Sequence, residues 1–265
     1  MTRFKRYLKQ FSLIVLIAIG LLLPAWLNSP ALSNTNSLTS LLPGEFNFSA
    51  PSDIGKPDRR QGGATRSPGE CLANEKNQLT ALSPVGGSFT MKAYPNFSWY
   101  LPANSAQKIS FYLMDPESPN DIYYTSYLLA KNNGDASIKE PSKIINLEIP
   151  DSVNVAPLEV NKTYSWLVEV YCDSSGARDF WASGEIQRVE PEPAVINQLK
   201  QAQTPEARLA IYAQARLLPE TLETLFEIER SNPNSPDVQA TWQKIISSLK
   251  FINPIDDPEV SLSTQ

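Results

Sequence analysis

Histidine is absent from this chain of 265 residues, and only two residues are cysteine. The commonest general base and the commonest metal ligand of proteins are therefore missing. Nucleophilic systems that pair serine or cysteine with histidine are excluded, as is a zinc site that uses histidine. Two cysteines cannot form an all-cysteine zinc site either, because that site needs four thiolates. We therefore predict no catalytic, cofactor-binding or metal-ligating residue.

Glycine is scarce as well, with 11 residues against 22 prolines, and charged residues make up 19% of the chain. This composition favours many short elements that end at fixed turns. Hydrophobic residues reach 42%, which is ordinary for a globular protein. The length allows one or two domains.

The longest hydrophobic run lies at the N-terminus. Four basic residues between Arg3 and Lys9 precede the uncharged run Phe11–Leu23, and Ala31-Leu32-Ser33 fits a small-residue cleavage site. This order predicts a signal peptide over residues 1–33, cleaved near Ser33, and an exported protein that is periplasmic or extracellular. The run is short for a membrane-spanning helix, which needs about 20 residues. The alternative is an uncleaved segment, which would then be the chain's contact with the membrane.

Cleavage would take the net charge from −5 to −9, because residues 1–33 hold four basic and no acidic residues. An acidic chain of this kind is unsuited to nucleic acid and to an anionic membrane surface. The partners that we expect are an envelope protein or a glycan.

Cys71 and Cys172 are the two cysteines, 101 residues apart. An exported chain with an even cysteine count predicts a disulfide between them. Closing a loop of that length is worth about 4.7 kcal/mol in the chain-entropy model. The alternative is two free thiols.

The stretch before Cys71 reads RRQGGATRSPGEC and concentrates positive charge in an acidic chain. Arg59, Arg60 and Arg66 lie among glycines whose amides could join them around an oxyanion. They are candidate contacts to an anion or to an acidic partner. The alternative is a solvated loop, since the Lys-Ser/Thr ending of a phosphate-binding loop is missing.

Residues 59–190 are expected to form a β-sandwich domain. Seven or eight short runs rich in β-branched and aromatic residues recur between turn clusters, at the spacing of an antiparallel sandwich of the immunoglobulin or fibronectin type III kind. The expected strands are Leu79–Leu82, Ser88–Lys92, Asn96–Leu101, Lys108–Met114, Ile122–Ala130, Lys143–Ile149, Thr163–Cys172 and Asp179–Val189.

The run Thr163–Cys172 alternates most clearly. Period two places Tyr164, Trp166 and Cys172 on one large apolar face, which should be the core. Tyr164 follows a turn as the tyrosine of a tyrosine corner does, so we expect its hydroxyl to bond to a nearby backbone group.

The remaining segments differ in pattern. Residues 34–58 show no period and read as a flexible leader. Residues 191–252 predict four helices, with Thr204 and Ser235 as N-caps before prolines, in a small bundle similar to one tetratricopeptide unit. Residues 253–265 read as a loose tail.

Two groups of carboxylates could carry chemistry. Asp115, Glu117 and Asp121 follow a strand, but their spacing lacks the glycine and terminal glutamate of a calcium loop, which favours a solvated turn. Glu169 and Glu185 lie on neighbouring expected strands and could act as a glycosidase pair at the right separation. An exposed sheet face is the simpler interpretation of that pair.

Aromatic residues are numerous in the expected sandwich. Alternation suggests an outward set, for which we take Tyr123, Thr125 and Tyr127, and such a set could form a platform for a ligand or a sugar. Cross-strand packing within the sheet is the alternative.

Several motifs together resemble a known family. They are GGATR before a cysteine, Pro95-Asn96-Phe97-Ser98-Trp99, the Tyr164-to-Cys172 strand, an exit at Ile186-to-Pro191, and a helical tail with Leu209, Tyr212 and Trp242. The chain is similar in these to the cyanobacterial secreted family catalogued as domain of unknown function nine hundred twenty-eight (DUF928). The resemblance implies a bacterial envelope location and implies no activity.

These observations lead to one expected function and two alternatives. The expected function is a non-catalytic binding or scaffolding module of the bacterial envelope. The alternatives are a carboxylate-dependent hydrolase and, if the N-terminal segment is kept, a membrane-anchored structural protein.

Overall fold

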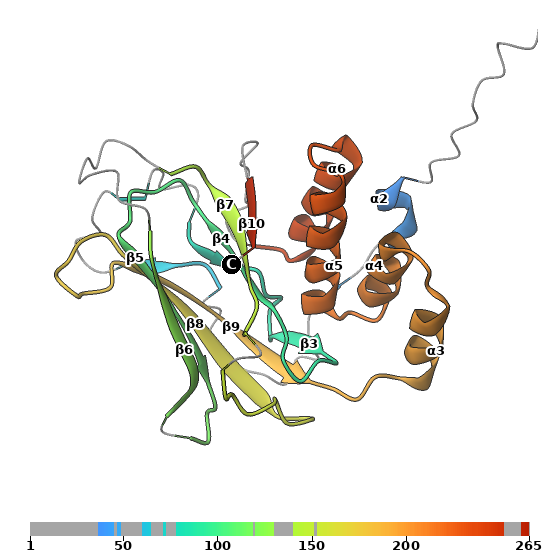
Figure 1. Cartoon of the computed structure of the whole chain (residues 1–265), viewed down its shortest axis with the longest axis horizontal. Coiled ribbons are helices and arrows are strands. Elements are labelled where there is room, and N and C mark those ends of the chain that lie inside the picture. Colours follow the sequence, from blue (N-terminus) through green and yellow to red (C-terminus); the bar gives the residue numbers. More distant parts are fainter. Residues whose placement is uncertain are drawn as a thin grey trace, which may run out of the picture. The chain divides into compact units, whose positions relative to one another are not determined.

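A computed structural model describes residues 37–44, 47–48, 60–64, 71–72, 78–118, 120–129, 140–150, 153–251 and 261–264. The expected signal peptide, Arg59 and Arg66 lie outside these residues. Residues Ser37–Gln265 form one compact unit in which two β-sheets are followed by helices (Figure 1). The prediction of a mainly β chain with a C-terminal α part is confirmed.

The larger sheet has six strands in the order β1-β9-β8-β5-β6, with β3 added beside β9. The smaller sheet has four strands in the order β10-β7-β4-β2. The strand bounds in the larger sheet are Gly63–Ala64 (β1), Ser88–Thr90 (β3), Lys108–Met114 (β5), Asp121–Leu128 (β6), Thr163–Tyr171 (β8) and Phe180–Arg188 (β9). Those in the smaller sheet are Thr80–Ala81 (β2), Phe97–Leu101 (β4), Lys143–Leu147 (β7) and Ser261–Thr264 (β10).

All eight expected strands are present, but purely antiparallel pairing is wrong. β3 pairs with β9 in parallel, and β10 pairs with β7 in parallel. A strand of three or four residues that joins the edge of a sheet gains its register from tertiary contacts. No local turn motif in the sequence predicts that pairing. The sheets are therefore mixed.

The main core lies between the two sheets. Tyr164, Trp166, Val168 and Val170 of β8 are buried there, as their alternation predicts. The Tyr164 hydroxyl accepts a hydrogen bond from the Glu159 backbone N–H at 3.0 Å, which confirms the expected bond to a nearby backbone group. It ties the loop before β8 to the start of that strand.

Gly184 gives the Trp166 indole the space that it occupies. The two residues are directly opposite on β9 and β8. A Cβ atom on Gly184 would lie only 2.6–2.7 Å from three atoms of that ring. Because the indole is itself held in the core with 2% exposure, it cannot simply swing away.

We therefore expect Gly184→Ala to destabilise the fold by about 1–3 kcal/mol, the usual cost of overpacking a core. Chemical denaturation of the variant and the parent measures this loss. Ser183→Ala is the matched control, since its side chain lies on the other face of β9. Equal midpoints for Gly184→Ala and the parent would contradict the proposed contact.

A second core lies between the smaller sheet and the helices. Tyr100 of β4 and Ile144 of β7 are buried against apolar residues of the helices, so this sheet has a core on each face. Figure 1 shows the helices beside β4 and β7. Their bounds are Leu38–Leu41 (α2), Pro193–Gln201 (α3), Pro205–Gln214 (α4), Leu218–Ser231 (α5) and Pro236–Ser248 (α6).

The expected helix starts are confirmed in position. The Thr204 hydroxyl accepts a hydrogen bond from the Ala207 N–H and so caps α4, with Pro205 at its first position. Ser235 occupies the N-cap position of α6, although its side chain makes no capping bond.

Two short elements lie within the segments expected to be a leader and a tail. Helix α2 lies in the expected flexible leader and packs on α6, where Asp237 accepts hydrogen bonds from Ser37 Oγ and the Leu38 N–H. Phe48 is fully buried in the second core. At the other end, β10 lies in the expected loose tail. The described parts of these segments show no sequence period because they are held by contacts with distant residues.

The predicted disulfide is present between Cys71 and Cys172, with a Cα–Cα distance of 5.6 Å. Cys172 directly follows β8, and the Ser105 N–H donates to the Cys71 carbonyl beside β5. The bond therefore attaches the segment around Cys71 to the central strands of the larger sheet.

Removing this bond by Cys71→Ser and Cys172→Ser should cost roughly 2–5 kcal/mol, the usual value for a native disulfide that closes a long loop. Thermal unfolding with and without reductant measures the effect. The melting temperature of the parent should fall on reduction, and that of the double variant should not change with the reductant. A parent that keeps its midpoint when fully reduced would contradict this assignment.

Candidate functional site

Of the three expected anion-contacting arginines, the structure describes Arg60, which is buried with 4% exposure. Its Nη1 donates to the Ser83 carbonyl at 3.0 Å and to the Leu249 carbonyl at 2.8 Å. The guanidinium also lies 5.0 Å from the centre of the Phe251 ring. Because Leu249 is the C-cap of α6, Arg60 supplies positive charge and donors where a helix end needs both. These contacts join the segments beside β1 and β2 to the end of α6.

A different cluster stands on the outer face of the larger sheet, the face that points away from the main core. Alternation along β5, β8 and β9 places its members on this face. We call them the Glu169 cluster, and they are Lys108, Tyr112, Glu169, Tyr171, Arg178 and Trp181. Figure 1 shows β5, β8 and β9 side by side, and Arg178 comes from the turn that joins the last two.

Glu169 is the centre of this cluster and is only 7% exposed. Its Oε2 accepts a hydrogen bond from the Tyr171 hydroxyl at 2.5 Å, and its Oε1 accepts one from Arg178 Nη1 at 2.5 Å. Both carboxylate oxygens are thus engaged, which compensates the loss of water around a buried charge. The carboxylate is fixed in place by its two partners.

Aromatic rings surround this carboxylate. The Arg178 guanidinium lies 4.8 Å from the centre of the Trp181 ring, and the Lys108 ammonium lies 3.8 Å from the centre of the Tyr171 ring. Tyr112 stacks at a tilt on Tyr124 of β6, with ring centres 4.9 Å apart. Cation–π contacts of this kind fix both partners while leaving the remaining N–H groups of the cations free to bond elsewhere.

The environment shifts the pKa of three tyrosines in the region. Burial, followed by the hydrogen bond to Glu169, raises the pKa of Tyr171. Burial also raises the pKa of Tyr112. The Ser126 hydroxyl, followed by that of Ser110, lowers the pKa of the exposed Tyr124. Tyr171 therefore stays a neutral donor to Glu169.

The residues of β6 that we considered as a possible platform face the other way. Tyr123, Thr125 and Tyr127 are opposite Leu113, Phe111 and Ile109 of β5, respectively, and both tyrosines pack against the main core. The outward residues of β6 are instead Tyr124, which is 51% exposed, and Leu128, which is 81% exposed. Alternation separates the two sets correctly, but it does not say which set points inward.

The structure does not bring Glu169 and Glu185 together. Ser165 is the residue opposite Glu185, so the two glutamates are offset by four residues along neighbouring strands. At about 3.3 Å per residue this offset is about 13 Å, beyond the separation that glycosidase carboxylates use.

Asp115 and Glu117 contact Lys162, with distances from its Nζ of 2.6 Å and 3.1 Å to their carboxylate oxygens. The hydrogen bond from Lys162 lowers the pKa of Asp115. Asp121 is exposed at the start of β6. Within the described residues no three His, Cys, Asp or Glu side chains gather as a metal site requires.

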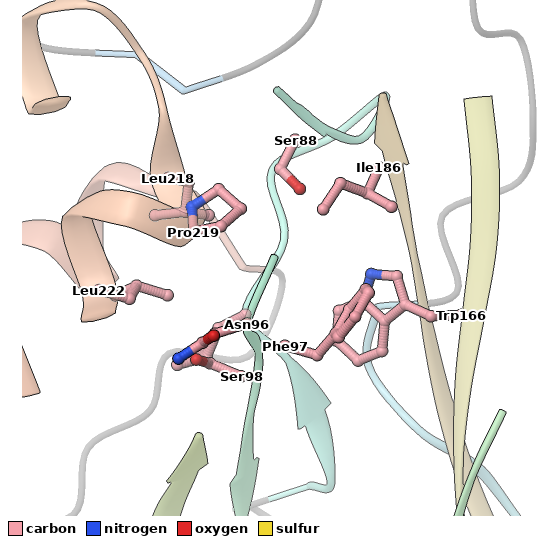
Figure 2. A pocket seen from close by; sticks show the side chains of 10 residues that line it. Ser88, Asn96, Phe97, Ser98, Trp166, Ile186, Leu218, Pro219 and Leu222 are labelled. Carbon is pink, nitrogen blue, oxygen red and sulfur yellow. The ribbon is translucent and has the colours of Figure 1, made fainter. Parts of the chain in front are cut away.

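A small recess lies where α5 meets the sheets. It is lined by Ser88, Asn96 and Ser98 on one side and by Leu218, Pro219 and Leu222 of α5 on the other, and Trp166 closes its inner end (Figure 2). The recess has room for about one water molecule, so it is too small for an organic ligand.

A buried carboxyl group holds the same junction. Glu220, the third residue of α5, is 1% exposed, and its Oε1 accepts hydrogen bonds from Thr90 Oγ1 at 2.7 Å and the Met91 N–H at 2.8 Å. Its Oε2 is buried without a hydrogen-bond partner. Burial raises the pKa of Glu220, although these bonds and the nearby Lys92 favour the ionised form.

A carboxyl with a raised pKa in the folded state stabilises the fold below its unfolded pKa, and this contribution is lost as pH rises through the folded pKa. Glu220→Gln keeps the acceptor oxygen and stays neutral. We expect the melting temperature of Glu220→Gln minus that of the parent to grow more positive from about pH 4.5 to pH 8, by a few degrees in all.

Thermal unfolding across this pH range tests the expectation. Glu223→Gln is the matched control, because Glu223 lies three residues further along α5 and pairs with Lys92 at the surface. Its melting temperature relative to the parent should show no such rise with pH. If the melting temperature of Glu220→Gln minus that of the parent stays flat or falls with pH, the folded protein does not raise the pKa of Glu220.

Sequence reasoning missed the Glu169 cluster as a unit. Glu169 was identified as a candidate carboxylate, but its position opposite Trp181 depends on the β8–β9 register. Two signals were available. Glu169 and Tyr171 are two residues apart on one strand, and Arg178 and Trp181 flank the far side of the turn. A hairpin with a short loop brings such residues together.

The family model described as Domain of Unknown Function (DUF928) matches residues 61–258, so the chain belongs to this family. The resemblance seen in the sequence motifs is confirmed. The match extends from just before β1 to beyond α6, and it therefore includes the larger sheet, the smaller sheet apart from β10, the Glu169 cluster and helices α3 to α6. A comparison with curated proteins finds no significant match. Within the described residues, no helix has the length and apolar character to cross a membrane.

Proposed function

We propose that the protein is a non-catalytic binding module of the bacterial envelope, and that the outer face of the larger sheet binds a glycan. The observation that carries this proposal is the Glu169 cluster. It places half-buried aromatic rings, a fixed carboxylate and two cations on a face that the core does not need.

The chemistry of this face suits a sugar. Aromatic rings offer flat apolar surface to the C–H faces of a pyranose, while carboxylate and guanidinium groups bond to its hydroxyls. A protein partner is supported less, because the described residues of this face form no broad apolar centre of the kind that stable protein interfaces use. Leu128 at the sheet edge is its most exposed aliphatic residue.

Binding without catalysis is the simpler proposal for this site. The chain has no histidine, and both oxygens of Glu169 are already engaged by Tyr171 and Arg178. A carboxylate in that state is an acceptor for hydroxyl groups rather than a free base.

Export forms part of the same proposal. The sequence of residues 1–33 has the order of a signal peptide, and the disulfide is compatible with an oxidising compartment. We take the host to be cyanobacterial on the motif resemblance. We take the sandwich to be related to immunoglobulin and fibronectin type III domains, which the Tyr164 bond supports, and the helices to be a tetratricopeptide-like unit.

Trp181→Ala should weaken glycan binding at least about tenfold, because an aromatic residue at the centre of a binding site commonly contributes more than 1 kcal/mol. The measurement is isothermal titration of the mature protein with soluble neutral and acidic polysaccharides and with solubilised peptidoglycan fragments. Circular dichroism checks that the variant is folded.

Tyr94→Ala is the matched control, since Tyr94 is 45% exposed and lies outside the Glu169 cluster. It should bind as the parent does. The proposal fails if no polysaccharide or peptidoglycan fragment binds the parent, or if Trp181→Ala binds normally while folded.

A further inference from the structure

Two cations share the Glu169 cluster with one carboxylate. Glu169 is neutralised by Arg178 at 2.5 Å, whereas Lys108 contacts the Tyr171 ring and forms no ion pair with any described residue. The nearby Asp179, which is outside the cluster, accepts a hydrogen bond from the Cys172 N–H. The cluster therefore carries an excess of positive charge in a chain whose net charge is −5.

Arg178 has donors to spare. Its side chain is 45% exposed, and of its nitrogens only Nη1 donates to an acceptor among the described residues. The Trp181 ring lies under the guanidinium and orients its plane. A guanidinium held in this way presents its remaining N–H groups as a planar fork, which matches the two oxygens of a carboxylate.

From this charge distribution we infer that the ligand is an acidic glycan whose sugars bear carboxylates, a polyuronate. This inference rests on the proposed glycan-binding function. Arg178 binds the uronate carboxylate through its unused N–H groups, Lys108 attracts a second acidic sugar, and the rings of Trp181 and Tyr112 contact the sugar faces. Glu169 holds Arg178 in position.

The test compares three soluble polymers by isothermal titration: polygalacturonate, neutral dextran and dextran sulfate. The parent should bind polygalacturonate best, and the binding should weaken between low and high salt because the interaction is electrostatic. Lys108→Gln and Arg178→Gln should each weaken polygalacturonate binding about tenfold or more, as expected for the loss of a hydrogen bond to a charged group.

Two further variants make the result interpretable. Lys200→Gln removes the same charge from the exposed surface of α3 and should bind as the parent does. Arg178→Lys keeps the charge at the cluster but loses the planar fork, so it should weaken polygalacturonate binding more than dextran sulfate binding. Circular dichroism confirms that each variant is folded, and Lys108→Gln leaves the Glu169–Arg178 pair intact if Arg178→Gln does not fold.

The outcomes separate the two proposals. Equal binding of dextran and polygalacturonate, with Lys108→Gln unaffected, overturns the acidic ligand but keeps the glycan-binding face. Dextran sulfate bound as tightly as polygalacturonate, with equal losses in Arg178→Lys, shows recognition of any polyanion and overturns the carboxylate class. Absence of binding to all three polymers and to peptidoglycan fragments overturns both proposals.

Discussion

Burial of the smaller sheet on both faces is the constraint on which the rest of the structure depends. Every residue of β4 is buried, with Phe97 and Trp99 facing the larger sheet and Tyr100 facing the helices. A sheet of this kind cannot exist alone in water, because one apolar face would stay exposed. The helices are therefore part of the fold that covers this sheet, and Arg60 and Glu220 join them to the strands across that junction.

Among the described residues, the outer face of the larger sheet belongs to neither core, and this asymmetry explains where a site can form. Its strands alternate buried and partly exposed residues, as β8 and β9 show. Side chains on the outer face contribute little to either core, so core packing does not restrict which polar or aromatic residues stand there. Glu169 is informative because it is buried on this outer face by its own neighbours, Tyr171 and Arg178, rather than by the core.

The features that the sequence predicts correctly are those that a local pattern of residues determines. Eight strands, four helices, the Thr204 cap and the inward face around Trp166 follow from periodicity and from turn residues. What it did not predict depends on contacts between residues far apart in the chain. α2 is short and is held by Asp237, some 200 positions later, and β10 gains its order by pairing with β7. The wrong direction of Tyr123 has the same origin, since only the register with β5 decides it.

Charged residues show most clearly why sequence alone misassigns a site. Arg60 stands in a basic, glycine-rich stretch that suggests anion binding, yet its guanidinium is buried on carbonyl groups at the end of α6. Arg178 stands in the loop between β8 and β9, where no sequence motif marks it as a binding residue. It is nevertheless half-exposed and keeps N–H groups that no described acceptor uses. An ion pair whose cation is half-exposed contributes little net stability, because solvent screens the attraction. The Glu169–Arg178 pair is therefore better explained by the geometry it imposes on the guanidinium than by any stability it adds to the sheet.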